Sequence, residues 1–334
     1  MFARIVLGPA VLVVLFCLLG CGTRTIISGD DDARTYGVVT GASSAHELKV
    51  RTLWLTGRVY GMQAEPDLML GGDNFPIVAA TGNTIQMSRD RSRVWIADEV
   101  RGVSMFNEPL AGGDRAPDLV LSPGADKIQS IWYEETRDII YAASPTASFI
   151  YAWDGASTGL SRPPDRSIEI AGYLGGAHVT GATGSDRLFV AATVNTVRKV
   201  LVYDQAHLAD GSQAPSRVFE PQEFSTLSPA WDGQRDILYL RARAAAVIQV
   251  YTSASTREGV VTPDRTITVS FPGMTAGDWV TSLAVAPEDD LLFVGMMLGQ
   301  LLVYRDISMR QGTVTPAQHE RVDENLFALG VFAQ

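Results

Sequence analysis

Residues 188–204 contain the pattern that decides the fold: Leu188-Phe189-Val190-Ala191, a polar turn, and then Val200-Leu201-Val202-Tyr203-Asp204. Both runs are short and rich in β-branched, aliphatic and aromatic residues, and turn-forming residues bound them, which is typical of strands rather than helices. The first run is apolar on both alternating faces, as in a strand that is buried on both sides. The stretch therefore predicts two neighbouring strands of a buried sheet.

This pair of runs returns along the chain, and each pair is followed by a proline at the start of another short strand. The last aromatic residue of a pair stands 11 or 12 residues before that proline. Successive prolines are 47 to 53 residues apart, and a weaker strand precedes each pair, so one repeat contains four strands. The six copies are Pro66-Asp67-Leu68, Pro117-Asp118-Leu119, Pro164-Asp165-Arg166, Pro215-Ser216-Arg217, Pro263-Asp264-Arg265 and Pro316-Ala317-Gln318. A period of this size, built from short strands, is typical of a β-propeller.

The proline motif has a structural explanation. The fourth strand of a blade is its outer edge, where outward N–H groups have no ladder partner, and proline is tolerated at such an edge or at the first residue of a strand. A glycine that precedes most of these prolines by four or five residues serves the long turn between strands three and four. We therefore interpret the motif as a structural feature of the turn and of the outer edge strand, rather than as a binding motif.

The two terminal repeats are incomplete in complementary ways. The N-terminal repeat lacks a clear first strand, whereas the chain ends in a lone strand at residues 325–332. Joining them would complete one blade and close the ring. The predicted fold is all-β: a six-bladed β-propeller of four-stranded antiparallel blades over residues 49–334, closed by a blade that the N- and C-terminal segments share. The chain resembles the NHL-repeat and TolB-like propeller group from residue 50 to the end, on the pattern of residues 188–204. That resemblance implies a fold and not an activity.

The first residues of the chain predict where in the cell the protein is located. Arg4 supplies a positive charge, residues 6–19 are mostly apolar but short for a membrane span, and Leu18-Leu19-Gly20-Cys21 resembles a bacterial lipobox. We expect residues 1–20 to be a lipoprotein signal peptide and Cys21 to carry lipid; the alternative is an uncleaved anchor or an ordinary signal peptide. Because Gly22 rather than aspartate follows the cysteine, the resemblance favours the outer membrane of a bacterial envelope.

Composition and charge exclude some partners. The formal net charge is −10, and removal of Arg4 with the signal peptide makes it one unit more negative. This argues against nucleic acid and against a polybasic membrane-binding surface, so the lipid alone is expected to attach the protein to a membrane. Loss of Cys17 and lipidation of Cys21 would leave no cysteine for a disulfide. Residues 21–48, which include Asp30-Asp31-Asp32, are expected to be the lipidated cysteine and a flexible tether.

Two sets of loops commonly build the binding face of a propeller: those before each first strand and those between strands two and three. Basic residues in these loops, on an otherwise acidic protein, can focus an anionic ligand, although ordinary solvated loop charge explains them as well. Tyr173 and Trp279 offer stacking surface, and Trp279 alternatively belongs to the core. The candidate binding mouth contains Asp98, Glu99, Arg101, Tyr173, His178, Asn195, Arg198, Lys199, Arg241, Arg243, Asp278 and Trp279.

The sequence favours a binding protein over an enzyme. No catalytic, phosphate-binding or metal-binding motif is present, and neither a cofactor nor a metal is predicted. The leading hypothesis is a membrane-tethered envelope lipoprotein that acts as a non-enzymatic binding or scaffold propeller for an envelope protein, peptide or glycan. The alternative is a metal-dependent hydrolase or lactonase of the gluconolactonase-like six-bladed type, with Asp98, Asn195 and Asp278 as conceivable ligands. A third hypothesis is a quinone-dependent sugar dehydrogenase that uses His178.

Overall fold

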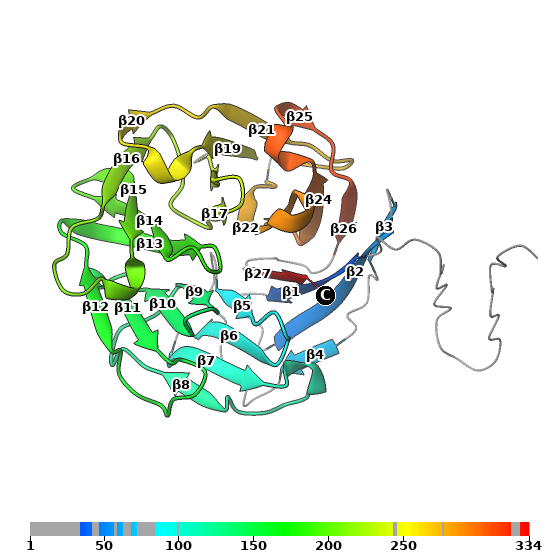
Figure 1. Cartoon of the computed structure of the whole chain (residues 1–334). Coiled ribbons are helices and arrows are strands. Elements are labelled where there is room, and N and C mark those ends of the chain that lie inside the picture. The colour runs from blue at the N-terminus through cyan, green and yellow to red at the C-terminus, as the bar shows by residue number, and fades with distance from the viewer. Residues whose placement is uncertain are drawn as a thin grey trace, which may run out of the picture.

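The chain folds into an all-β propeller. The computed structural model describes residues 34–41, 47–56, 59–62, 68–71, 84–98, 100–242, 246–275, 277–321 and 328–333. In these ranges, β-strands and short 3-10 turns are the regular elements, and the strands form small, mostly antiparallel sheets of four or five strands. The sheets stand around a common centre (Figure 1). The all-β propeller prediction is therefore confirmed.

Five sheets repeat one pattern, in which four strands follow one another from the axis outward. The inner strands β5, β9, β17 and β22 surround the centre in Figure 1. The five blades consist of β5 (Ile85–Met87), β6 (Arg93–Asp98), β7 (Gly102–Asn107) and β8 (Leu119–Leu121); β9 (Ser130–Glu134), β10 (Ile139–Ala143), β11 (Phe149–Asp154) and β12 (Arg166–Glu169); β13 (Tyr173–Gly181), β14 (Arg187–Val194), β15 (Val197–Asp204) and β16 (Arg217–Pro221); β17 (Ala230–Asp232), β18 (Ile237–Arg241), β19 (Val247–Thr252) and β21 (Arg265–Val269); β22 (Val280–Ala286), β23 (Leu291–Met296), β24 (Gln300–Arg305) and β26 (Gln318–Arg321).

The terminal segments form a sheet that departs from this pattern, so the described residues form five such blades and not the six predicted. Strand β27 (Ala328–Ala333) pairs with β1 (Arg34–Gly41), which pairs with β2 (Glu47–Thr56). Strands β3 (Val59–Met62) and β4 (Leu68–Gly71) both pair with β2, at opposite ends of it, instead of serving as third and fourth strands in series.

Part of the predicted tether is also strand. Residues 34–41, together with the start of β2, belong to the terminal sheet, although we expected residues 21–48 to be flexible. The segment Thr35-Tyr36-Gly37-Val38-Val39-Thr40 carries β-branched and aromatic residues, which favour strand when a partner edge is present. Cys21 and the three aspartates at 30–32 lie outside the described residues.

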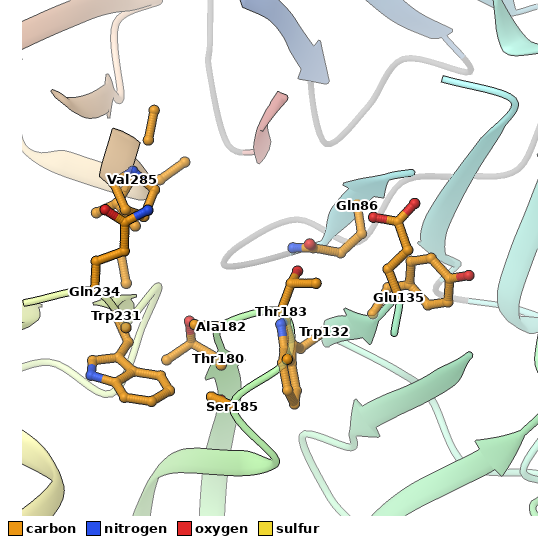
Figure 2. Close-up of a pocket in the computed structure, with 18 of the residues that line it drawn as sticks. Gln86, Trp132, Glu135, Thr180, Ala182, Thr183, Ser185, Trp231, Gln234 and Val285 are labelled. Atoms are coloured by element: carbon orange, nitrogen blue, oxygen red, sulfur yellow. The ribbon is translucent and has the colours of Figure 1, made fainter. Parts of the chain in front are cut away.

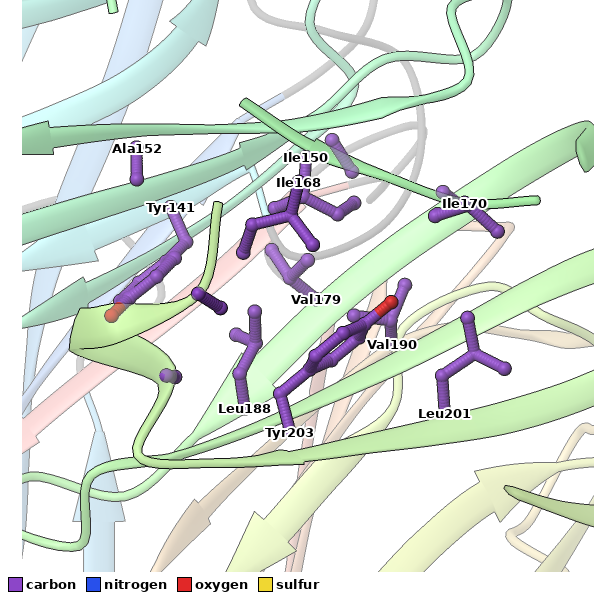
Figure 3. Close-up of a cluster of buried hydrophobic side chains, with 14 of the residues drawn as sticks. Tyr141, Ile150, Ala152, Ile168, Ile170, Val179, Leu188, Val190, Leu201 and Tyr203 are labelled. Atoms are coloured by element: carbon purple, nitrogen blue, oxygen red, sulfur yellow. The ribbon is translucent and has the colours of Figure 1, made fainter. Parts of the chain in front are cut away.

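The core lies between blades. The second strands are almost completely buried, as the apolar character of both of their faces predicts. One cluster joins Tyr141, Ile150 and Ile168 of one blade to Leu188 and Tyr203 of the next (Figure 3). Among the described side chains, neighbouring blades bury apolar faces against each other, and these contacts stabilise that part of the ring.

The residue after the motif proline closes the end of the third strand. Asp118, Asp165 and Asp264 each accept a hydrogen bond from a backbone N–H at that end, at 2.7, 2.9 and 2.7 Å, and the Ser216 hydroxyl does so at 3.0 Å. In the degraded copy, Ala317 keeps only a backbone hydrogen bond, from its N–H to the Val303 carbonyl at 2.7 Å. The residue after the proline therefore has a structural role at the end of the third strand.

The outer edge of several blades is paired, which the sequence interpretation did not anticipate. Strand β16 pairs in parallel with β20 (Gly259–Val261), and β21 pairs in parallel with β25 (Gly312–Val314), each partner coming from the next blade. Gly259 and Gly312 begin these partners in left-handed conformations, with φ of 70° and 75°, which a side chain would strain. The prediction that the outward edge lacks a ladder partner is therefore wrong for these strands.

Candidate functional site

The predicted mouth lies where the first strands begin and the second strands end. Asp98 ends β6, Arg101 is exposed in the turn that follows, and Asn195 is exposed in the tight turn between β14 and β15 with φ of 50°. Glu99 and Arg243 lie outside the described residues. These residues lie in or next to exposed loops, but their positions alone do not show that they form one binding site.

Two aromatic residues of the predicted mouth have different environments. The Tyr173 hydroxyl donates to the Ser144 carbonyl at 2.7 Å and accepts from the Ala177 N–H at 3.2 Å, so it fixes the entry into β13. Trp279 is 49% exposed, which rules out the core alternative. Its neighbour Asp278 is buried and turns back to accept hydrogen bonds from the Thr275 N–H and hydroxyl at 2.8 and 3.0 Å.

His178 is completely buried in β13. Its Nε2 lies 2.7 Å from the Gln129 side-chain nitrogen, which also donates to the Ala177 carbonyl at 3.3 Å. Burial and, to a lesser extent, the nearby Arg241 charge together lower the pKa of His178 to about 3. The imidazole is therefore neutral at physiological pH.

Three cations of the predicted mouth, Lys199, Arg198 and Arg241, differ in how they are paired. Lys199 forms an ion pair with Glu220 at 2.9 Å. Arg198 donates from Nη1 to the Phe224 carbonyl at 2.9 Å. Arg241 donates from Nη1 to the Val280 carbonyl of the next blade, and both burial and the charge of Arg198 lower its pKa. Arg241 thus lies within electrostatic range of both His178 and Arg198.

A cavity of about 580 Å³ lies at the other end of the inner strands. It takes in the last residues of β13 and the turn after it, whereas the predicted mouth contains the loop before that strand. All five blades contribute to it, through residues such as Gln86, Glu135, Thr183, Gln234 and Val285. Figure 2 shows Gln234 and Trp231 on one side, Gln86 and Glu135 on the other, and Thr183 between them.

Several of the residues that line this cavity offer amides and hydroxyls. Gln86 and Gln234 supply side-chain amides, and Thr180, Thr183 and Ser185 supply hydroxyls. Thr183 and Ser185 are exposed, so solvent reaches the cavity from this end. Uncharged groups of this kind pair with a polar ligand without requiring a counter-charge.

Charged side chains mark the rim of the cavity. The Arg89 guanidinium lies 4.0 Å from the Glu135 carboxylate and 3.9 Å from that of Glu288, and the Arg89 backbone N–H donates to Glu135 at 3.0 Å. These contacts connect three blades at the end of the propeller axis where the turns between first and second strands lie. Because Arg89 is largely exposed, the pairs contribute little to stability, but they define the opening.

Two tryptophans line the cavity, yet other side chains cover their faces. Trp132 stacks on Tyr141 with ring centroids 5.4 Å apart and lies against Gly181, where a Cβ would clash with the indole. Trp231 packs on Phe189 at 4.7 Å. The indoles therefore act as walls between blades and leave no open aromatic face for a ligand.

The sequence interpretation missed these cavity residues because they lie in the turns between first and second strands, which were not assigned to the binding face. Within the described ranges, no three His, Cys, Asp or Glu side chains gather as a set that would hold a metal ion. No helix in the described part of the chain has the length and apolarity to span a membrane. No protein-family model matches the chain, and no curated protein matches its sequence.

Proposed function

We propose that this propeller is a non-enzymatic binding protein that takes a segment of another protein into its axial cavity. The observation that carries the proposal is the cavity of about 580 Å³, whose lining combines amides and hydroxyls with the ion pairs of Arg89. A concave site that combines apolar walls with a few convergent polar groups is the usual form of a ligand site.

The lining favours a peptide over a glycan. Each of Gln86 and Gln234 offers a donor and an acceptor, which is the complement of a peptide group. Met87 and Val285 provide apolar contact for a side chain. A sugar ring gains most from an open aromatic face, and those of Trp132 and Trp231 are covered.

The cellular context of the proposal comes from the sequence. Lipidation at Cys21 after loss of residues 1–20 would hold the propeller at a bacterial envelope membrane, with the outer membrane as the destination. The partner would then be another envelope protein. We further propose that the chain is related to the NHL-repeat and TolB-like propellers. We also propose that the sheet that contains β1 and β27 closes the ring of blades.

The test is a selection of random peptides on the purified chain, followed by affinity measurement on variants. The double variant Gln86→Ala/Gln234→Ala should weaken a selected peptide at least tenfold, since two hydrogen bonds of about 1 kcal/mol each are lost. Thr183→Trp should also weaken it by narrowing the cavity.

Gln213→Ala is the matched control, because Gln213 is exposed on an outer loop. It should bind as the parent chain does. Selected peptides that bind the cavity variants and the parent equally well would overturn the proposal, and so would a glycan screen that finds a ligand while peptide selection finds none.

A further inference from the structure

Arg241 occupies a position that small residues hold in the other four blades. The ladders between the second and third strands place Arg241 opposite Ile248. In the same register, Ala97, Ala143 and Ala191 stand opposite Val103, Ile150 and Val200, and Gly295 stands opposite Leu301. One blade therefore carries a long cation where the repeat otherwise has almost no side chain.

The first strand of this blade is also unlike the others. In two other blades, Ser130 faces Ala143 and His178 faces Ala191 across the ladder between first and second strands. Strand β17 pairs with β18 only from Ala230 onward, and before it the Ser225 N–H donates to the Arg241 carbonyl at 2.8 Å. The ladder is thus interrupted beside Arg241.

The charge of Arg241 has no carboxylate partner among the described residues, and its hydrogen bond goes to the Val280 carbonyl. A second cation, Arg198, is close enough to lower its pKa. Removing a guanidinium from water without a counter-ion is costly. An anion at this place would offset that cost.

His178 supplies a second, independent observation. The Gln129 amide nitrogen donates to Nε2 of the neutral ring, so the remaining proton lies on Nδ1. Nδ1 is buried and has no hydrogen-bond partner among the residues that the structure describes. A buried donor that lacks an acceptor is rare, and an acceptor from a ligand would satisfy it.

Arg198 is accessible from solvent. It lines a surface hollow of about 430 Å³ together with Thr193, Thr196 and Phe224. Glu223 lines the same hollow and is exposed. A small ligand in the hollow therefore contacts Arg198, the cation that lowers the pKa of Arg241.

We propose that Arg241 and the Nδ1–H of His178 form an oxyanion-binding site, with Arg198 at its entrance. The ligand class is a carboxylate or a phosphate, because a guanidinium edge donates two N–H hydrogen bonds to two oxygens of either group. This site lies at the opposite end of the inner strands from the cavity of about 580 Å³, and it does not depend on the peptide-binding function.

The test uses the full chain and small probes. Acetate and inorganic phosphate, each added at constant ionic strength against chloride, should shift the NMR signal of the His178 Nδ1–H and raise the melting temperature. Arg241→Ala restores the residue that three other blades carry, and it should weaken the response at least tenfold. Arg235→Ala, which removes an arginine at the other end of the blade, is the control and should respond as the parent does.

The two probes distinguish the source of the oxyanion: a stronger response to acetate assigns a carboxylate, and a stronger response to phosphate assigns a phosphate. If Arg241→Ala does not fold, Arg241→Lys keeps the charge and loses the two-oxygen geometry, so it should bind more weakly than the parent. No response to either probe, or an equal response in Arg241→Ala, would overturn the proposal.

Discussion

The carboxylate of Asp236 holds Ser255 by two hydrogen bonds, one from the Ser255 backbone N–H at 3.0 Å and one from its hydroxyl at 2.7 Å. Asp236 lies in the turn between first and second strands, in a left-handed conformation, and Ser255 lies in the turn after the third strand. Asp138 with Ser157 and Asp290 with Ser308 repeat this contact in two other blades. The same Asp236 also accepts from the Trp231 indole at 3.2 Å, which connects the contact to the cavity wall.

Asp236→Ala should lower the free energy of unfolding by about 1–3 kcal/mol, because partly buried donors lose a charged acceptor. Asp236→Asn retains one acceptor oxygen and the tolerance for the left-handed conformation, so it should lose less. Urea unfolding measures both. Glu258→Ala removes an exposed acid and should be nearly neutral; an equal loss in that variant would contradict the assigned role of Asp236.

Acid should remove part of the stability that Asp204 provides. Burial acts to raise the pKa of Asp204, but hydrogen bonds from Arg187 and Arg217 outweigh it, and the pKa is lowered. A carboxyl whose pKa falls on folding stabilises the protein above its unfolded pKa, and this contribution is lost as pH falls through the folded value. The difference in urea midpoint between the parent and Asp204→Asn should therefore be larger at pH 7 than at pH 3. A difference that does not change with pH would refute the prediction.

Gly181 allows two blades to meet at the cavity wall. A Cβ there would clash with the Trp132 ring, which is itself fixed against Tyr141. Gly181→Ala should cost about 1–3 kcal/mol by overpacking. At Gly277 a Cβ would have ordinary contacts, so Gly277→Ala serves as the comparison in the same thermal or urea assay. Equal stability of the two variants would show that the indole can move away.

The repeated strands could be predicted from the sequence, because a strand buried on both faces is apolar at every position, as β10 and β23 are. The number of regular blades could not be predicted from the sequence. The proline copies count repeats, but they do not reveal that β3 and β4 share the edge of β2, nor that residues 34–41 supply a strand.

The site was only partly predictable. Loop position pointed to Arg198 and Arg241, but their contacts depend on neighbouring blades, which one repeat cannot show. His178 was assigned to a loop entering a strand, yet it is fully buried and bonded to Gln129 of the preceding blade. Gln86 and Gln234 carry no local signal, because the cavity exists only where five inner strands converge.

Lipid attachment is a separate prediction. Cells that express the chain should incorporate labelled palmitate into it, and Cys21→Ser should abolish both the label and sedimentation with membranes. Cys17→Ser should retain both, because Cys17 lies in the segment expected to be removed. Membrane association that persists in Cys21→Ser would contradict attachment by lipid alone.

Photo-crosslinking from the cavity is the most direct test of whether a peptide binds in the axial cavity. A photoreactive amino acid replaces Thr183, which lines the cavity, or Gln213, which lies on an outer loop, and each variant is irradiated with a selected peptide. Binding in the axial cavity should give a crosslink from position 183 that excess unlabelled peptide suppresses, and none from position 213. A crosslink from position 213 alone, or equal yields from both, would contradict binding in the axial cavity.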